Sequence, residues 1–408
     1  MLNRVLEIAE ENRYISLDRG FIVIESKGEE LGRIPLDDIA VLLLSAQSIT
    51  ITKNIINALA ERGCISVFCG KKYIPQSIVT PVGLHTFHSK ILKLQIASSE
   101  PFKKKIWQQI VIRKIEHQAM VLDLFGKNSA LVMKISKMVK SGDTDNREAY
   151  AARMYWSELF GNSFVRDKNG DGINAVLNYG YAVMRSAMIR AICIHGLEPS
   201  LGIFHDNNQN SFCLSDDFFE VYRPIVDAVA FKLFQQGETE LTLTVKKVLA
   251  KVLNAIVDIR NEKTQIVQSM NIMVSSYVNA LENKNAFITL PVMEKNADGT
   301  AIIEWYELMW IFVFFDLPVV EKKERKDATK FRNLLLDNGF NMVQYSIYTR
   351  LFSGKDACKK YYRLIQNNLP KEGKVDILTV TDAQYSNIIS FNARKKQEKK
   401  SQEQLLLF

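Results

Sequence analysis

Residues 103–125 read KKKIWQQIVIRKIEHQAMVLDLF, and their apolar side chains recur with the i, i+3, i+4, i+7 spacing of an amphipathic helix. The same period returns in EAYAARMYWSELFG (148–161) and in INAVLNYGYAVMRSAMIRAICIHG (173–196). Proline, which interrupts helices, is almost absent from this part of the chain. The sequence therefore predicts an all-α domain, which we place at residues 85–286.

Short apolar runs separated by turn signals precede this helical region. The runs with the composition of strands lie at 13–26, 39–45 and 64–70. The first run holds two strands that turn at Asp18-Arg19-Gly20, and one segment, from Thr52 to Arg62, has a helical pattern and a Gly after it. Residues 1–84 are therefore expected to form a β-rich domain.

A third pattern follows the helical region. Pro291 and Asp298-Gly299 break the helical period, which predicts a connector at 287–308. After it, strands are predicted at 309–316, 342–349 and 374–380, and helices at 321–338 and 357–368. This order is typical of a ferredoxin-like α/β sandwich, here at 309–393, followed by a basic tail and a terminal strand at 394–408. The predicted fold class is a multidomain α+β protein.

The composition is that of a soluble globular protein. Of the 408 residues, 47% are hydrophobic and 24% are charged, and no apolar run reaches the roughly 20 residues of a membrane helix. The first residues carry acids and no small-residue cleavage site, so no secretory signal is predicted. Five cysteines without CxxC spacing argue against a disulfide framework or a zinc ribbon. These features favour a reducing, cytoplasmic compartment.

The positive charge is concentrated near the C-terminus. The net charge is +8, and residues 309–408 contain 18 Lys and Arg against 11 Asp and Glu. A basic module on a neutral body is typical of a surface that binds nucleic acid. The alternative is a solubilising tail, because RKKQEKK (394–400) supplies much of the excess.

Acids and a histidine in the helical region form the strongest candidate site. Glu148 shares a helix face with small residues, His205 closes the turn-rich passage GLEPSLGIFH, and Asp217 and Glu220 share a helix face further on. Two carboxylates and an imidazole are a donor set suited to Mg²⁺ or Mn²⁺. Each residue also has a structural explanation, as a helix-dipole acid, a loop histidine or a solvated acid, and spacing alone does not establish that they meet.

Several chemistries find no support in the sequence. It contains neither GxxxxGK[ST] nor GxGxxG, so a nucleotide-hydrolysing or dinucleotide-binding site is not expected. The cysteines lie in apolar contexts, which favours small core residues over nucleophiles.

The order of several passages resembles the CRISPR-associated protein one family, the integrases of CRISPR adaptation, in their type II form. These passages are PLDDIAVLLL, NREAYAARMYW with FGNSF, DGINAVLNYGYA, GLEPSLGIFH and LSDDFFEVYRPIVD. The resemblance implies that Glu148, His205 and Glu220 are the catalytic metal ligands, with Asp217 as an auxiliary acid. Many relatives have Asp as the third ligand, so Glu220 is a departure. The resemblance also implies DNA contacts by Arg153, Arg166, Tyr179 and Arg223, although Tyr179 fits a packed helix residue equally well.

Residues 309–393 resemble CRISPR-associated protein two, the small partner of that integrase. The matching passages are WIFVFFDLP, RNLLLDNGFNMVQYSIYTRLF and GKVDILTVTDAQY. Asp316 matches the nuclease-type acid of that family, with a structural role as the alternative. Separate partners assemble as two integrase dimers around one dimer of the small protein. A 1:1 fusion cannot reproduce this ratio without idle modules.

Together, the two resemblances imply a metal-dependent integrase that joins the 3′-hydroxyl of a prespacer duplex to a CRISPR leader-repeat. The implied partners are double-stranded DNA, further copies of the chain paired through both kinds of domain, and other type II CRISPR proteins, including the RNA-guided effector nuclease. A structure-specific DNA nuclease and a non-catalytic DNA-bridging protein are the alternatives.

Overall fold

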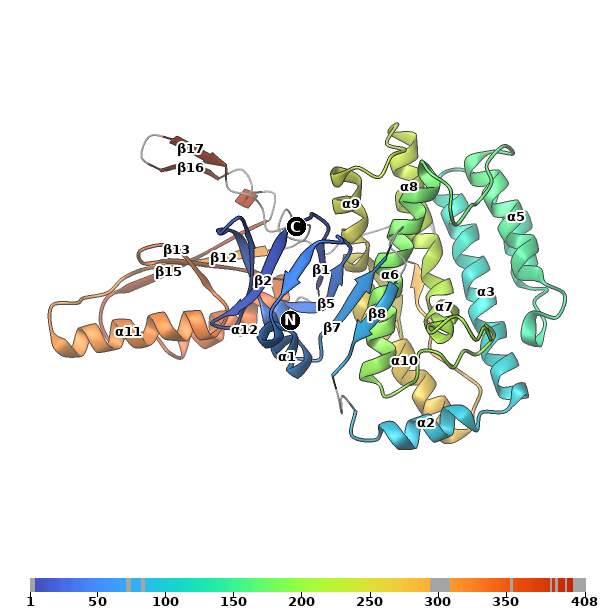
Figure 1. Ribbon diagram of the computed structural model, residues 1–408, viewed down its shortest axis with the longest axis horizontal. Coiled ribbons are helices and arrows are strands. Elements are labelled where there is room, and N and C mark those ends of the chain that lie inside the picture. Colours follow the sequence, from blue (N-terminus) through green and yellow to red (C-terminus); the bar gives the residue numbers. More distant parts are fainter. Residues whose placement is uncertain are drawn as a thin grey trace.

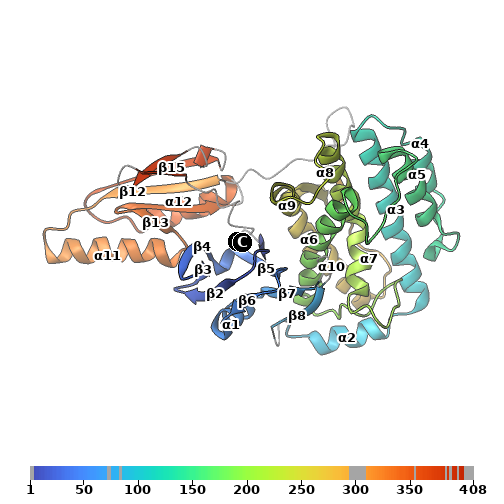
Figure 2. The ribbon, with the colours of Figure 1, turned by 45° about the horizontal axis from the view of Figure 1, so that its top comes forward.

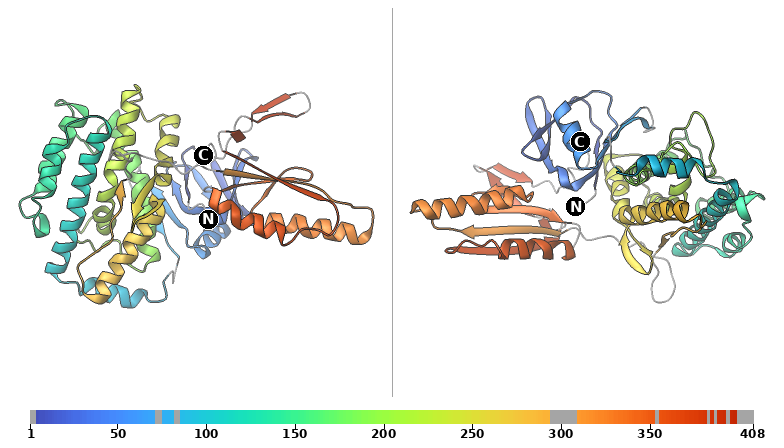
Figure 3. Two further views of the ribbon diagram at one scale, coloured as in Figure 1. Left: turned by 180° about the vertical axis from the view of Figure 1, so that it is seen from behind. Right: turned by 90° about the horizontal axis from the view of Figure 1, so that it is seen from below.

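The structure is a computed structural model that describes residues 4–70, 75–81, 85–293, 309–352, 355–381, 384–385, 388–392 and 395–398. The N-terminal β-rich domain lies between the helical domain and the C-terminal domain (Figure 1). This arrangement is also visible when the molecule is tilted or viewed from behind and below (Figures 2 and 3). Within the described ranges, no helix is long and apolar enough to cross a membrane.

Two four-stranded sheets build the N-terminal domain. One has the order β1 (Arg4–Ile8), β5 (Ile39–Leu44), β7 (Ile65–Cys69) and β8 (Pro75–Val79). The other has the order β4 (Glu29–Pro35), β3 (Phe21–Ser26), β2 (Arg13–Asp18) and β6 (Ile49–Ile51), with η1 (Leu36–Asp38) and α1 (Lys53–Glu61) beside them. The β2–β3 turn has positive φ angles at Arg19 and Gly20, 44° and 83°, as a tight hairpin requires. The predicted strands and helix of this region are confirmed.

The helical domain is built around two long helices. The helices of this domain are α2 (His88–Ile96), α3 (Glu100–Leu124), α4 (Ala130–Ser136), η3 (Ser141–Asp143), α5 (Arg147–Phe160), α6 (Ile173–Ile194), α7 (Cys213–Phe219), η4 (Glu220–Tyr222), α8 (Arg223–Gln235), α9 (Leu243–Ala250), η5 (Lys251–Asn254) and α10 (Ile266–Asn283). The longest, α3 and α6, contain 25 and 22 residues, and α6 is buried along most of its length. The helical period predicted for α3, α5 and α6 is confirmed.

The prediction of an all-α domain is wrong in one part, because this domain also contains a small sheet. β10 (Glu262–Gln265), β9 (Ile256–Ile259) and β11 (Val292–Met293) form a small antiparallel sheet. The β9–β10 turn places Arg260 and Asn261 at φ 58° and 63°, and the Asp258 carboxylate accepts a hydrogen bond from the Asn261 amide at 3.1 Å. Three of the four residues of β9 are β-branched, and with this tight turn they favour a hairpin, so the helix prediction is wrong there.

The C-terminal domain has the element order β–α–β–β–α–β. Its elements are β12 (Met309–Asp316), α11 (Lys322–Asp337), β13 (Asn341–Gln344), β14 (Ile347–Phe352), α12 (Lys355–Gln366) and β15 (Lys374–Thr381). The sheet order is β13-β14-β12-β15, with every pair antiparallel. Alternate residues of β12 point to the same face: Ile311 and Val313 pack with Phe331 of α11 in one buried cluster.

The structure corrects two of the predictions for the C-terminal part of the chain. The predicted single strand at 342–349 is wrong, because the chain turns between β13 and β14 and Ser346 has a φ of 64°. Residues 395–398 of the predicted basic tail form β17, which pairs with β16 (Ile389–Asn392). The terminal strand expected at 404–408 and most of the connector, 294–308, lie outside the described residues.

A buried ion pair joins the C-terminal domain to the N-terminal domain. The Arg350 guanidinium on β14 lies 3.4 Å from the Asp38 carboxylate in η1, and both side chains are almost fully buried. Arg350 also donates to the carbonyl of Asn338 and lies over the rings of Phe352 and Tyr361. Contacts within its own domain therefore help to hold Arg350 in position to pair with Asp38.

Candidate active site

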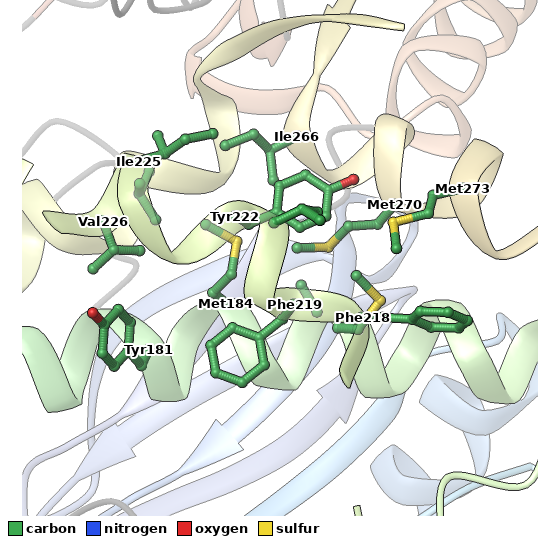
Figure 4. Close-up of a cluster of buried hydrophobic side chains, with 14 of the residues drawn as sticks. Tyr181, Met184, Phe218, Phe219, Tyr222, Ile225, Val226, Ile266, Met270 and Met273 are labelled. Carbon is green, nitrogen blue, oxygen red and sulfur yellow. The ribbon is translucent and has the colours of Figure 1, made fainter. Parts of the chain in front are cut away.

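Glu220 lies at a break between the helices α7 and α8. α7 ends at Phe219, η4 makes one tight turn, and α8 begins at Arg223, followed by Pro224. The residues at this break pack against α6 and α10 in one buried apolar cluster, which includes Phe219, Tyr222 and Met270 (Figure 4). Because both flanks are packed, the carboxylate of Glu220 has a fixed position inside the domain.

Two cations hold the Glu220 carboxylate. Lys114 Nζ of α3 lies 2.6 Å from Glu220 Oε2, and Arg223 Nε lies 2.9 Å from Glu220 Oε1. Burial raises the pKa of Glu220, but Arg223 and Lys114 outweigh it, so this pKa lies below the usual range. Glu220 is therefore a buried carboxylate that stays ionised.

Glu148 approaches the same lysine from another helix. Asn146 has a left-handed φ of 51°, and the Asp143 carboxylate accepts hydrogen bonds from the amides of Arg147 and Glu148 at 2.8 and 3.0 Å, which fixes the start of α5. The Glu148 side chain then forms an ion pair with Lys114 Nζ. Desolvation lowers the pKa of Lys114, but Glu220 and Glu148 outweigh it and keep the ammonium charged. One buried cation thus bridges two carboxylates from separate helices.

His205 is oriented by Asp217. Asp217 is completely buried and accepts hydrogen bonds from the backbone amides of Ile203, Phe204 and His205 at 2.6, 3.0 and 3.2 Å. His205 Nδ1 lies 2.6 Å from the same carboxylate, and this hydrogen bond raises the pKa of His205. Gly202 is required in this loop because a Cβ there would overlap the carbonyl oxygen of His205. With Nδ1 engaged, Nε2 is the ring nitrogen left to bind a ligand.

The three predicted ligands come from separate segments of the helical domain. Two of them contact the same lysine, and the third lies nearby. Glu148 and Glu220 share Lys114, and His205 is near enough to lower the pKa of Glu220 electrostatically. Among the described residues, no three His, Cys, Asp or Glu side chains are close enough to form a ready metal cluster. The residues nevertheless fit a hard cation. Glu148 and Glu220 offer carboxylate oxygens, which hard cations prefer, and the Lys114 ammonium, 2.6 Å from the buried Glu220 Oε2, already places a positive charge between the two carboxylates.

The four residues expected to contact DNA have different surroundings. Arg153 is exposed on α5. Arg166 is half-buried and donates to Asn178 at 2.5 Å, and Arg223 stands over the Phe219 ring at 4.2 Å, so both have roles inside the domain. Tyr179 is completely buried and donates to Glu7 of β1, which favours the packed-helix alternative. Asp316 is exposed at the end of β12.

Sequence reasoning missed three contributors to the site. Lys114 had a detectable signal, because it lies four residues after Ile110 and four before Gln118 on the buried stripe of α3. Asp143 and Asp227 had none. Asp227 is buried on α8, four residues after Arg223, and accepts hydrogen bonds from Tyr155, at 3.1 Å, and from Tyr181.

Comparison with known proteins matches the two parts of the chain separately. The model of the family "CRISPR associated protein Cas1" matches residues 6–255, and that of "CRISPR associated protein Cas2" matches residues 309–388. The CRISPR-associated endonuclease Cas1 of Neisseria meningitidis is 39% identical over 276 residues, 67% of this chain and 90% of the relative. The CRISPR-associated endoribonuclease Cas2 of Paracidovorax avenae is 47% identical over 104 residues, 25% of this chain and 96% of the relative.

Solved structures share the fold of the larger part. A casposase bound to its integration product has a TM-score of 0.59 at 18% identity and covers 69% of this chain and 91% of its own. A Cas1 protein from Thermotoga maritima has a TM-score of 0.56 at 13% identity, covering 68% and 97%. A Cas6-RT-Cas1–Cas2 complex has a TM-score of 0.57 at 16% identity, covering 70% and 35%. This chain therefore belongs to the Cas1 family and carries a Cas2 domain in the same polypeptide.

Proposed function

We propose that this protein is a CRISPR adaptation integrase that inserts prespacer DNA at the leader-repeat and repeat-spacer junctions of a CRISPR array. The observation that carries the proposal is the meeting of Glu148 and Glu220 on one buried cation, with His205 and its Asp217 partner beside them. Similarity to proteins named endonuclease Cas1, and a shared fold with a casposase bound to its integration product, support it.

In this proposal, Glu148, Glu220 and His205 hold Mg²⁺ or Mn²⁺. A bound divalent ion would supply Lewis-acid stabilisation of the charge that develops on the phosphoryl oxygens. The chain's own residues prepare the site: Arg223 fixes one oxygen of Glu220, Asp217 fixes the ring of His205, and Asp143 fixes the start of the helix that carries Glu148. Each ligand is therefore oriented by a neighbour that does not itself react.

The proposed reaction exchanges one phosphodiester for another. The 3′-oxygen of the prespacer forms a bond to phosphorus at the repeat boundary while the bridging oxygen of the repeat strand leaves. The proton of the 3′-hydroxyl is released, and the leaving oxygen takes one up. Because the number of phosphodiester bonds is unchanged, the reaction needs no ATP. A chain without a phosphate-binding loop motif is consistent with this.

The C-terminal domain is proposed as a scaffold for the middle of the duplex. Its βαββαβ order and its antiparallel sheet support a ferredoxin-like fold. The helix α11 places Lys322, Arg325, Lys326 and Lys330 along a cavity of about 900 Å³. Basic side chains of this kind bind phosphates without reading sequence. Assembly would pair integrase domains and C-terminal domains from several copies, and a type II effector nuclease is a further proposed partner.

The deciding experiment is strand transfer from a labelled duplex into a supercoiled plasmid that carries a leader-repeat. The wild type should join the DNA in Mn²⁺ and not in EDTA, and a 3′-blocked duplex should not react. Glu148→Gln should reduce joining by about 100-fold or more while duplex binding is retained. Glu158→Gln, at an exposed position of the same helix, is the matched control and should leave joining unchanged.

The alternatives give different results in the same assay. A structure-specific nuclease would cut a 3′-blocked substrate as readily as an open one. A DNA-bridging protein would bind the duplex without any metal-dependent product. Either result, or full joining by Glu148→Gln, would overturn the proposal.

A further inference from the structure

Lys114 is an unusual residue for a helix core. It lies on the buried stripe of α3 with only 7% of its surface exposed, and its ammonium group contacts carboxylates from α5 and η4. Removing either carboxylate would leave a buried charge with one partner fewer, which is strongly unfavourable. Lys114 is therefore part of the site and not a surface lysine that happens to reach it.

We propose that Lys114 acts as an internal cation, which holds Glu148 and Glu220 together until a divalent metal displaces it. This inference rests on the proposed metal-dependent function. Glu220 is buried and Glu148 is half-buried, so their carboxylates repel each other more strongly than two carboxylates in bulk water, and a positive charge between them offsets that repulsion. The ammonium of Lys114 provides this charge in the metal-free protein, so the ligands are positioned before the metal arrives.

The two cations beside Glu220 differ in their freedom to move. Arg223 is confined, because its guanidinium lies over the rings of Phe219 and Tyr181 at 4.2 and 4.9 Å and forms an ion pair with Glu220 Oε1. Lys114 has a flexible four-carbon stem, and a lysine ammonium is a point charge without fixed orientation. An incoming dication would repel both side-chain cations, and the Lys114 ammonium is the one whose flexible stem allows it to move away from the carboxylates. Arg223 would then remain to orient Glu220.

The test compares metal binding with metal-free stability in the full-length protein. Mn²⁺ affinity is measured by calorimetry for the wild type and for Lys114→Met, and unfolding temperatures are measured in EDTA and in Mn²⁺. Lys114→Met should bind Mn²⁺ on the order of tenfold more tightly, because a competing unit charge is gone. It should also unfold at a lower temperature than the wild type in EDTA, with most of that loss restored by Mn²⁺.

Two further variants make the result specific. Lys90→Met removes a lysine from an exposed ion pair, 2.6 Å from Glu282, and should change neither quantity appreciably. Lys114→Arg retains the charge in a group that holds carboxylates more firmly, so it should weaken Mn²⁺ binding while retaining stability in EDTA. If Lys114→Met does not fold, Lys114→Arg still decides the question through its metal affinity.

The outcomes separate this inference from the proposed function. If the wild type binds no Mn²⁺, or if Glu148→Gln and Glu220→Gln bind as well as the wild type, the metal site itself is wrong. If those variants lose Mn²⁺ but Lys114→Met binds it no more tightly, the site is right and the internal-cation role is wrong. Equal destabilisation of Lys114→Met with and without Mn²⁺ would show a purely structural lysine.

Discussion

His205 Nδ1 and Asp217 Oδ1 lie 2.6 Å apart, and the same buried carboxylate accepts hydrogen bonds from three successive backbone amides of the histidine loop. One side chain thus sets both the path of the loop and the orientation of the ring. The auxiliary acid of the sequence prediction is a residue that positions His205 from beneath.

Asp217→Asn should therefore weaken Mn²⁺ binding by about 10–100-fold, the usual cost of losing a group that orients a metal ligand. Calorimetry on the purified variant measures this directly. Asp206→Asn, an exposed change next to His205 in the same loop, is the control. Equal affinities of Asp217→Asn and the wild type would contradict the positioning role.

Tyr179 and Arg153 should behave in opposite ways. Tyr179→Phe removes a donor from the buried Glu7 carboxylate, so it should lower the free energy of unfolding by about 1–3 kcal/mol and leave the salt dependence of DNA binding unchanged. Arg153→Ala should retain stability and reduce the salt slope of binding by about 1, as expected for one phosphate contact. Denaturant unfolding and fluorescence anisotropy over a salt series measure both. A changed salt slope in Tyr179→Phe would restore the DNA-contact role.

Asp227 should give the protein a pH-dependent stability. Burial raises its pKa from 3.8 to about 7, despite hydrogen bonds from Tyr181 and Tyr155 that favour ionisation. Between these two values the folded state binds the proton and the unfolded state does not, so this group's contribution to the free energy of unfolding falls as pH rises.

Asp227→Asn removes that titration. The stability difference between wild type and variant should therefore shrink or reverse from pH 4 towards pH 7 and become constant above about pH 8. Urea unfolding at several pH values measures it. A difference that is independent of pH would show that Asp227 is ionised throughout.

The Asp38–Arg350 pair should control how firmly the Cas2 domain is held against its own N-terminal domain. Asp38→Asn removes the charge from a buried pair and should weaken the contact by about 1–3 kcal/mol. Small-angle scattering should then show a larger radius of gyration. Asp37→Asn makes the same change at the neighbouring residue, whose carboxylate instead binds Arg62 of the N-terminal domain at 2.9 Å, and should leave the radius unchanged.

Local patterns predicted most elements, and three-dimensional packing decided the rest. Helical periodicity identified α3, α5 and α6, and turn residues identified the β2–β3 hairpin. The β9–β10 hairpin was missed because its strands have only four residues each and lie between helical segments. The β13–β14 turn was missed because Ser346, with a φ of 64°, occupies a position where Gly or Asn is the usual residue.

The site was predictable only in part. The acids and the histidine stand out in the sequence because polar residues of these types suit metal chemistry and resemble a family pattern. Their neighbours do not: Asp143 binds amides four and five residues away, and Asp227 is paired with tyrosines 72 and 46 residues away. The Asp227 contacts depend on the packing of whole helices, which residue spacing does not encode. The Asp143 contacts are local and depend on the turn in which Gly142 and Asn146 have positive φ angles.

The Asp38–Arg350 pair also has a consequence for biosynthesis. Its two members are 312 residues apart, which a ribosome translating about 5–20 residues per second covers in on the order of half a minute. During that interval the N-terminal domain can fold with its acidic half of the pair already in place. The Cas2 domain, which is translated after the N-terminal domain, then meets a preformed docking surface on its own polypeptide, without a search through solution for a separate protein.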